Sequence, residues 1–336
     1  PAPYERVSNI HMYMREFASE QGTHFFECGE GVCHQLVIEN NLVKPGDLVL
    51  GTDSHTCTYG AVGAFSTGVG ATDMAAALFT GKNWFKVPET IRINLKGQLQ
   101  EGCSAEDIIL YVIGLLGNYK AIEFHGEYLE TCSLADRMTI ANMVVELGAK
   151  AGFTCHKNLG IHPDEGASYC REYDIDLDAL SPGIAKPHFV DNYSPVSELE
   201  GRPINYAFLG SCTNGRIEDL RAAANILRGK KIADGVRLLV VPASRRVLSE
   251  AMEEGIVADL MDAGAVFFTP GCAACVGTHG GVPGDGEVVI STANRNFKGR
   301  MGNNKAFIYL ASTETLAASC LSGVITDPRK AWRNEP

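Results

Sequence analysis

Three cysteines have the spacing and surroundings of metal ligands. Cys272 and Cys275 form a Cys-x-x-Cys pair, and Cys212 lies in the segment GSCTNG. Thiolates in such turns bind zinc, form a redox dithiol or hold an iron–sulfur cluster. Three cysteines would leave one iron of a four-iron cluster without a protein ligand, so that iron could act as a Lewis acid on a hydroxyl group. Zinc would need a fourth ligand, and His279 is a conceivable candidate.

The chain contains 11 cysteines in total. Its first residues, PAPYERVSNI, contain no apolar segment of the kind that secretory signal peptides carry. We therefore expect a cytoplasmic protein, in which disulfides are rare and Cys-x-x-Cys pairs more often serve metal or redox chemistry. Cysteines without such spacing are usually small, buried apolar side chains. This interpretation applies to Cys28, Cys33, Cys103, Cys132, Cys155, Cys170 and Cys320.

Titratable groups that could transfer protons lie in three further places. Asp53 and His55 share one tight turn, and His34 lies in the Gly-rich segment GEGVCHQ. Glu146 follows Asn142 by four residues on a predicted helix, so the two share a face. Carboxylate–imidazole pairs are what proton transfer near neutral pH requires. Two simpler interpretations stay open here: Asp53 as a turn former and His34 as an ordinary core histidine.

An arginine-bearing loop could bind the substrate. Arg295 and Arg300 lie in the segment NRNFKGR, which follows a predicted buried strand. Their planar guanidinium groups are suited to carboxylates, which they bind through two parallel hydrogen bonds. Because the chain has a net charge of −11, positive charge for an anionic substrate must be supplied locally. The alternative is a solvated basic loop without a ligand.

These candidate residues follow the ends of predicted strands. Short apolar runs alternate with helical segments, which indicates a parallel sheet with helices on both faces. In open sheets of this kind ligands bind beyond the carboxyl ends of the strands, so we expect one convergent site. The predicted strands are 47–51, 91–95, 205–209, 237–241, 265–269 and 287–291, the predicted helices are 10–21, 71–80, 105–116, 135–149, 217–227 and 246–254, and 182–205 is the predicted linker.

Length and charge set further bounds. The 336 residues are many for a single hydrophobic core, so two or three lobes are expected. An acidic chain does not attract nucleic acid or an anionic membrane through its overall field. The longest apolar run, Ile108 to Leu116, is far shorter than the roughly 20 residues that a membrane span needs. We therefore expect neither nucleic acid nor a membrane among the partners.

Together, these segments resemble the signature blocks of the aconitase superfamily. The resemblance runs nearly end to end, and it is strongest to the large subunits of 3-isopropylmalate dehydratase, homoaconitase and 2,3-dimethylmalate dehydratase. The blocks are GEGVCHQ (29–35), GTDSHT (51–56), MTIANMVVELGAKAG (138–152), GSCTNGR (210–216), PGCAACVG (270–277) and STANRNFKGR (291–300). Several such blocks in order are much more specific than any one of them.

The resemblance implies a role for each candidate residue. A [4Fe-4S] cluster would be held by Cys212, Cys272 and Cys275, with Asn142 and Asn294 forming hydrogen bonds around it. The catalytic pairs would be His34 with Asp53 and His55 with Glu146. The substrate would be bound by Ser54, Arg295 and Arg300. The reaction would be the dehydration and rehydration of a small hydroxy di- or tricarboxylate, most simply 3-isopropylmalate in leucine biosynthesis.

The resemblance also implies an aconitase-like α/β fold and a partner. We expect three-layer α/β/α lobes with mainly parallel sheets at 1–87, 88–195 and 196–336. Large subunits of this family carry a further N-terminal segment with an acid–base histidine, which would precede residue 1. A swivelling domain, which brings the base serine, would be a separate small subunit, so we expect activity only in its presence. The alternatives are a zinc or dithiol enzyme and a cluster-free RNA-binding regulator, which the acidic charge disfavours.

Overall fold

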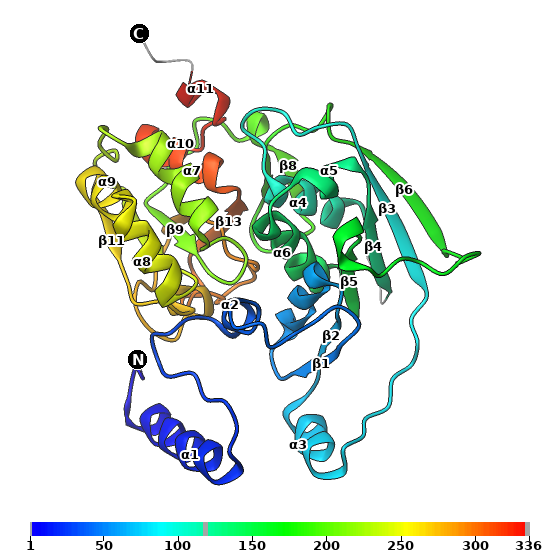
Figure 1. Ribbon diagram of the computed structural model, residues 1–336. Helices are drawn as coiled ribbons and strands as arrows, with labels where there is room; N and C mark the ends of the chain where they lie inside the picture. Colours follow the sequence, from blue (N-terminus) through cyan, green and yellow to red (C-terminus); the bar gives the residue numbers. More distant parts are fainter. Residues whose placement is uncertain (1, 117–119, 333–336) are drawn as a thin grey trace.

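The computed structural model describes residues 2–116 and 120–332 (Figure 1). Its α-helices are α1 (Glu5–Gln21), α2 (Cys33–Glu39), α3 (Ala71–Thr80), α4 (Ala105–Leu115), α5 (Glu127–Thr131), α6 (Leu134–Met143), α7 (Ile217–Leu227), α8 (Arg245–Glu253), α9 (Ile256–Ala263), α10 (Thr313–Ser322) and α11 (Arg329–Trp332). Its strands are β1 (Leu48–Gly51), β2 (Phe65–Gly68), β3 (Thr90–Lys96), β4 (Ala121–His125), β5 (Ala151–Thr154), β6 (Arg171–Asp176), β7 (Gly183–Ala185), β8 (Tyr193–Pro195), β9 (Tyr206–Gly210), β10 (Arg237–Val241), β11 (Ala265–Phe267), β12 (Val288–Ser291) and β13 (Phe307–Ala311).

The strands form three sheets. A two-stranded sheet pairs β1 with β2, and a four-stranded sheet has the order β5-β4-β3-β6; both are parallel. The third sheet has seven strands in the order β11-β10-β9-β12-β13-β7-β8, in which only β7 and β8 run antiparallel to their neighbours. The mainly parallel α/β architecture predicted from the sequence is therefore confirmed.

Two hydrophobic cores hold the larger sheets. One core lies between the seven-stranded sheet and helices α7 to α10, and it includes Leu209, Val240 and Leu316. The other joins the opposite face of that sheet to the four-stranded sheet through α4 and α6, and it includes Phe124, Ile109 and Phe208. The two sheets thus share one helical layer instead of each having its own, and Figure 1 shows α4 and α6 between them.

Most predicted elements are found within one or two residues of their expected bounds. The helix α7 has the predicted bounds, and α4 begins with the expected capping box, in which Ser104 and Asp107 exchange hydrogen bonds. The predicted helix 135–149 was wrong in its second half, because α6 ends at Met143 and continues as a short 3-10 helix, Val144–Leu147. The α6 carbonyl of Asn142 instead accepts a hydrogen bond from the Cys57 thiol at 3.3 Å.

The segment predicted to be a linker was also wrong. It forms β7 and β8, which extend the third sheet, and Ile184 is fully buried there. The strands of the third sheet therefore begin at Gly183, before the boundary expected at residue 196. The division of the chain into three lobes stays a prediction.

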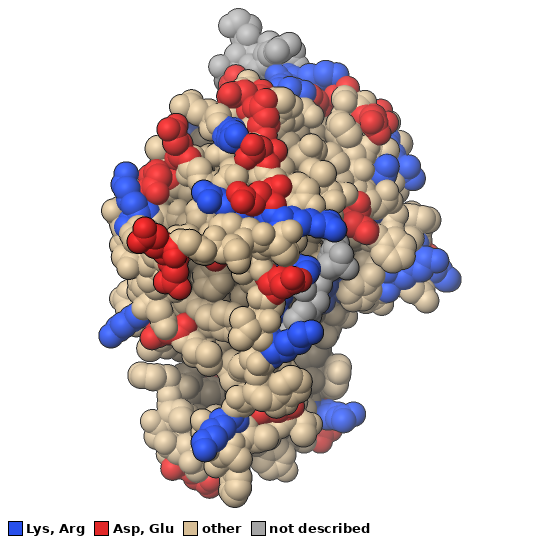
Figure 2. All heavy atoms as spheres, turned by 90° about the vertical axis from the view of Figure 1, so that its right-hand side faces the viewer, with Lys and Arg blue, Asp and Glu red and all other residues tan. Residues whose placement is uncertain are grey.

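Two helices lie at the margin of the fold. The N-terminal helix α1 lies apart from the two large sheets in Figure 1 and leaves Met14 and Phe17 exposed. The helix α3 leaves Leu78 and Phe79 exposed, the latter at 93%. In the described part of the chain, no helix combines the length and apolar character required to cross a membrane. On the face that Figure 2 shows, acidic and basic side chains are interspersed.

Candidate active site

The candidate site lies where the direction of strand order reverses in the seven-stranded sheet. The chain proceeds from β9 outward through β10 to β11, and then returns to the other side of β9 with β12. The loops after β9 and β12 leave adjacent strand ends in opposite directions, which opens a crevice there. Cys212 lies in the first of these loops, Asn294 and Arg295 lie in the second, and Cys272 and Cys275 follow β11. The predicted residues therefore meet at one edge of the sheet.

Two of the three cysteines share a single amide group. The Asn294 side chain donates a hydrogen bond from Nδ2 to the Cys212 sulfur at 3.2 Å, and its Oδ1 lies 3.7 Å from the Cys275 sulfur. Because both contacts are made by one planar amide, these sulfurs lie less than ~10 Å apart. Cys272 is joined to Cys275 by one 3-10 turn, Ala273–Val276, in which the Cys275 N–H donates to the Cys272 carbonyl. The three cysteines are thus grouped in space.

The spacing of the three sulfurs does not suit a single zinc ion. A zinc ion at ~2.3 Å from each sulfur would bring the sulfurs to within about 4 Å of one another. Among the described residues, the one group of three possible ligands whose donor atoms all lie within 4.8 Å is Glu123, His125 and Cys155. The three cysteines of the crevice are not such a group, so at least one pair of their sulfurs lies farther apart than 4.8 Å, which leaves room for a larger cluster.

The backbone around these cysteines is strained. In the described residues, three non-glycine residues have a positive φ, and two of them are direct neighbours of the cysteines. Ser211, with φ 81°, precedes Cys212, and Ala273, with φ 42°, follows Cys272. Left-handed backbone at residues with a Cβ costs of order 1–3 kcal/mol and persists where surrounding structure enforces it, often at functional sites. The strain therefore marks both loops as shaped for a purpose beyond connecting elements.

Burial and hydrogen bonding act in opposite directions on these thiols. Burial raises the pKa of Cys212 to about 12, while the N–H groups of Asn142 and Asn294 favour the thiolate. Burial likewise raises the pKa of Cys275, against the effect of Arg300, whose Nη2 donates to its sulfur at 3.5 Å. Thiolate ligands must lose their protons, so these donors are suited to sulfurs bound to metal. The donor set thus fits an iron–sulfur cluster.

The first carboxylate–histidine pair is His34 with Asp53. His34 Nε2 lies 2.9 Å from Asp53 Oδ1, and the imidazole is buried while the Asp53 side chain is 55% exposed. Burial disfavours the charged imidazole, but hydrogen bonds with Asp53 and Cys33 outweigh it and raise the His34 pKa to about 9. Asp53 also accepts the His55 N–H at 2.8 Å and so caps the 3-10 helix Ser54–Val62. Asp53 therefore does both things considered for it: it forms the turn, and it pairs with His34.

The second pair is His55 with Glu146, and an arginine joins it. His55 Nε2 lies 3.0 Å from Glu146 Oε1, and Arg295 Nε donates to the same oxygen at 2.7 Å. The Glu146 side chain is only 9% exposed, so these two partners take the place of water as hydrogen-bond donors to its carboxylate. Ser54 Oγ lies 3.4 Å from the other ring nitrogen of His55. The structure thus brings four predicted site residues into one hydrogen-bonded group.

A hydrogen-bonded network supports Cys212, and it includes Asn142 and Asn294, which the resemblance placed around the cluster. Asn142 Nδ2 donates to Thr58 Oγ1 at 2.8 Å as well as to the Cys212 sulfur at 3.3 Å. Thr213 Oγ1 lies between the two asparagines, donating to Asn142 Oδ1 at 3.2 Å and accepting from Asn294 Nδ2 at 2.9 Å. The two asparagine and two threonine side chains are buried. Thr213 could have been predicted, because it belongs to the segment GSCTNG. Thr58 could not, because nothing in the sequence around Thr58 singles it out.

Arg216, which follows the Cys212 turn, is a further arginine of the crevice and is buried. The residue is 3% exposed. Its guanidinium group donates hydrogen bonds to the Cys212 carbonyl at 2.7 Å and to Thr139 Oγ1 at 3.2 Å. It also donates to Gln35 at 3.2 Å, which ties the Cys212 loop to α2. Arg216 is therefore a positioning residue whose loss would damage the loop.

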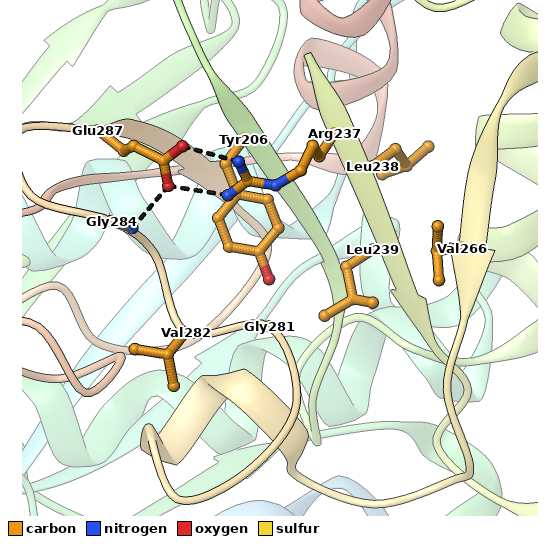
Figure 3. A pocket seen from close by; sticks show the side chains of 9 residues that line it. All are labelled: Tyr206, Arg237, Leu238, Leu239, Val266, Gly281, Val282, Gly284 and Glu287. Carbon is orange, nitrogen blue, oxygen red and sulfur yellow. Dashed lines mark hydrogen bonds and ion pairs between the residues drawn. The ribbon is translucent and has the colours of Figure 1, made fainter. Parts of the chain in front are cut away.

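A further pocket lies away from these residues. It has a volume of about 440 Å³ and is lined by residues of β9, β10 and the loop that leads to β12 (Figure 3). Arg237 pairs with both oxygens of Glu287 at 2.8 Å and lies over the Tyr206 ring, as Figure 3 shows. None of the predicted site residues lines this pocket. By contrast, a pocket of about 310 Å³ opens beside Ser54 and is also lined by Lys150.

Several cysteine predictions also need correction. Cys28, Cys33 and Cys170 are exposed and not buried, whereas Cys320 is fully buried as expected. The Cys33 sulfur lies 3.7 Å from the His34 ring, and this contact contributes to the raised pKa of His34. The spacing of lone cysteines in the sequence carries no information about which strand face or helix face they occupy.

Comparison with known proteins agrees with this geometry. A family-wide sequence profile, described as the aconitase family (aconitate hydratase), matches residues 2–158 and 154–323. The chain is 50% identical to the 3-isopropylmalate dehydratase large subunit 2 of Archaeoglobus fulgidus, covering 98% of this chain and 84% of that protein. It is 46% identical to the homoaconitase large subunit of Thermus thermophilus, covering 100% and 84%.

A solved structure with a similar fold agrees with the sequence relatives. The holo-form crystal structure of aconitase X from Thermococcus kodakaraensis superposes with a TM-score of 0.53 at 14% identity, covering 87% of this chain and 72% of that chain. At this identity the likeness concerns the fold alone. The family profile, the sequence relatives and the shared fold together show that the chain belongs to the aconitase family.

Proposed function

We propose that this chain is the cluster-binding large subunit of a hydro-lyase that dehydrates and rehydrates a small hydroxy-carboxylate, with 3-isopropylmalate as the substrate. The observation that carries the proposal is the convergence of Cys212 and Cys275 on the amide of Asn294. Two separate strand ends contribute these sulfurs, and two carboxylate–histidine pairs lie in the same crevice. The names of its relatives, several of them 3-isopropylmalate dehydratase large subunits, support the choice of substrate.

The cofactor in this proposal is a [4Fe-4S] cluster held by Cys212, Cys272 and Cys275. When bound through three thiolates, such a cluster supplies an iron with an open position that acts as a Lewis acid toward a hydroxyl group. The wide spacing of the sulfurs supports a cluster over zinc, and the buried N–H donors of Asn142 and Asn294 suit thiolate sulfur. Arg300 adds a positive charge beside Cys275.

The protein's own groups bind the substrate and hold its protons. His34, with its raised pKa, is protonated on both ring nitrogens at neutral pH; its Nε2–H donates a hydrogen bond to Asp53, and the proton on Nδ1 is the one that it could give up as a general acid. Glu146 orients the His55 imidazole by accepting from its Nε2, and Arg295 fixes Glu146 in turn. Arg300 is the cation best placed for a substrate carboxylate, because its buried Nε has no hydrogen-bond partner among the described residues.

Activity in this proposal requires a small subunit. The relatives named above are large subunits, a name that implies a smaller partner. That partner would carry the base serine and further substrate-binding arginines, and it would contribute to the choice of acid. Homoaconitase activity is the second candidate, favoured by the 46% identity to the Thermus thermophilus protein. The interspersed charges in Figure 2 and the net charge of −11 give no support to an RNA-binding role.

The test combines anaerobic reconstitution with a substrate panel. The chain is loaded with iron and sulfide, its iron and sulfide are counted, and it is assayed with and without a small subunit on 3-isopropylmalate, homocitrate and 2,3-dimethylmalate. We expect four irons per chain, a brown protein, and turnover of 3-isopropylmalate by the pair but not by this chain alone. A colourless protein that retains only zinc, or turnover without any small subunit, would refute the proposal.

A further inference from the structure

The outer face of the four-stranded sheet carries a group of side chains that the proposed reaction does not use. Glu123 and His125 are two residues apart on β4, so both point away from the core into which Ile122 and Phe124 are buried. Cys155 follows the neighbouring strand β5, and its N–H donates to the Phe124 carbonyl at 2.9 Å, which continues the strand pairing. The three side chains therefore emerge side by side from a rigid, paired part of the sheet.

Their donor atoms are close enough to share one ion. One ring nitrogen of His125, the Cys155 sulfur and a Glu123 carboxylate oxygen all lie within 4.8 Å of one another. The His125 Nε2 to Glu123 Oε2 distance is 3.2 Å, about the separation of two ligands on one tetrahedral zinc ion. The His125 and Glu123 side chains are 14% and 22% exposed, so the site is sheltered but still open to an ion and one water.

A surrounding layer of contacts fixes the carboxylate and the imidazole. The Tyr169 hydroxyl donates to Glu123 Oε2 at 2.8 Å, and the Tyr169 ring meets the His125 ring edge to face at 6.3 Å. The Arg92 guanidinium lies over the Tyr169 ring, at 5.5 Å from its centre. Outer contacts of this kind orient metal ligands and are part of natural metal sites.

We propose that Glu123, His125 and Cys155 form a zinc site, with water as the fourth ligand. Sulfur, imidazole nitrogen and carboxylate oxygen are the three donor types that zinc takes in proteins, whereas magnesium and calcium bind through oxygen alone. The ion would join β4 to the end of β5 and, through Tyr169, to the segment that leads into β6. The site lies across the sheet from α6 and the candidate active site, so it acts as a structural clamp independent of the proposed reaction.

The test uses the chain with its iron–sulfur cluster loaded, so that Cys212, Cys272 and Cys275 are not free to bind zinc. The protein is equilibrated anaerobically with a few equivalents of Zn²⁺ and desalted, and zinc and iron are counted by mass spectrometry. X-ray absorption at the zinc edge then reads the zinc ligands separately from the iron. We expect about one zinc per chain with unchanged iron, and one sulfur among four zinc neighbours.

Variants separate this site from other thiols and imidazoles. Cys155→Ser and His125→Gln should each weaken zinc binding at least tenfold and abolish the rise in melting temperature that zinc produces in the parent protein. Cys170→Ser, at an exposed cysteine beside Tyr169, should retain both. The proposal is overturned if the parent retains no zinc, if Cys155→Ser retains zinc as well as Cys170→Ser does, or if the zinc edge shows no sulfur neighbour. The absorption measurement on the parent decides the matter even if a variant fails to fold.

Discussion

The His34–Asp53 pair makes the stability of this protein depend on pH in a predictable direction. Pairing raises the His34 pKa from 6.5 to about 9, so the folded chain binds a proton that the unfolded chain releases near pH 6.5. The stabilisation is therefore fully present below pH 6.5 and is lost as the pH rises through 9. The full shift would correspond to about 3 kcal/mol, but because Asp53 is 55% exposed, solvent screening reduces the expected value to about 2 kcal/mol.

The substitution Asp53→Asn tests this coupling with little change in shape. Asparagine is as good a helix cap as aspartate, so the 3-10 helix that begins at Ser54 keeps its cap. The charge that stabilises the buried imidazolium is lost, and burial then lowers the His34 pKa. We expect the variant to be less stable than the parent by about 2 kcal/mol at pH 6, with the difference disappearing toward pH 10.

The assay is the free energy of unfolding, measured with urea between pH 6 and pH 10. Asp47→Asn is the matched control, because Asp47 also accepts a backbone N–H, from Lys44, but has no histidine partner. The Asp47→Asn variant contains the same exposed thiols as the parent. Its free energy of unfolding should therefore change with pH in the same way as that of the parent. If the Asp53→Asn and parent curves run parallel, or if NMR titration of His34 gives a pKa below 7, the charge-pairing argument is wrong.

Three further predictions concern the cysteines and the arginines. Asn294→Asp places a carboxylate against the Cys212 thiolate, so we expect iron and sulfide content to fall several-fold and iron loss in air to accelerate, measured by metal analysis and visible absorption. In the assembled enzyme, Arg300→Lys should lower kcat/KM by about 30- to 1000-fold, on the order of 2–4 kcal/mol, while the cluster absorption is retained. Arg295→Lys should lower kcat more than it raises KM, because Arg295 acts through Glu146.

Matched substitutions on the surface control both experiments. Asn304→Asp introduces the same charge in an exposed position of the same loop and should leave the iron content unchanged. Arg228→Lys alters a surface arginine that pairs with Asp259 and should leave kcat/KM unchanged. Near-normal kcat/KM in both loop variants, Arg300→Lys and Arg295→Lys, would mean that this loop does not bind the substrate. Normal cluster retention in Asn294→Asp would mean that the Asn294 amide does not help to hold the cluster cysteines.

The elements of the fold were largely predictable because their signals are local. Short apolar runs and capping residues such as Ser104 lie within a few positions of the structure they determine. The prediction failed where a distant contact decides the outcome. The helix expected to reach residue 149 ends at Met143. The Cys57 thiol, which is 85 residues away in the sequence, donates a hydrogen bond to the Asn142 carbonyl. The strands β7 and β8 are too short, with three residues each, to produce an alternating pattern.

The candidate site shows the same division. The positions of the cysteines at strand ends predicted that they would meet, since parallel strands place their carboxyl ends at one edge. The residues that orient them were harder to find. The resemblance placed Asn142 and Asn294 around the cluster, but no local pattern links Arg216 to Gln35, which lie 181 residues apart. Arg216 stands at the start of α7, and only the folded chain reveals that it is buried.

The arginines of the crevice differ in how far the protein itself already uses their charge. Arg295 has its Nε committed to Glu146, and Arg216 is buried against the Cys212 carbonyl, so each of these cations already offsets a group of the protein. Arg300 differs, because only Nη2 is engaged, through a long 3.5 Å contact with Cys275, while its Nε has no partner among the described residues. A buried donor without a partner costs free energy that a bound carboxylate would recover. We therefore expect the three arginines to have different roles, with Arg216 shaping the loop, Arg295 orienting the acid–base pair and Arg300 binding the substrate.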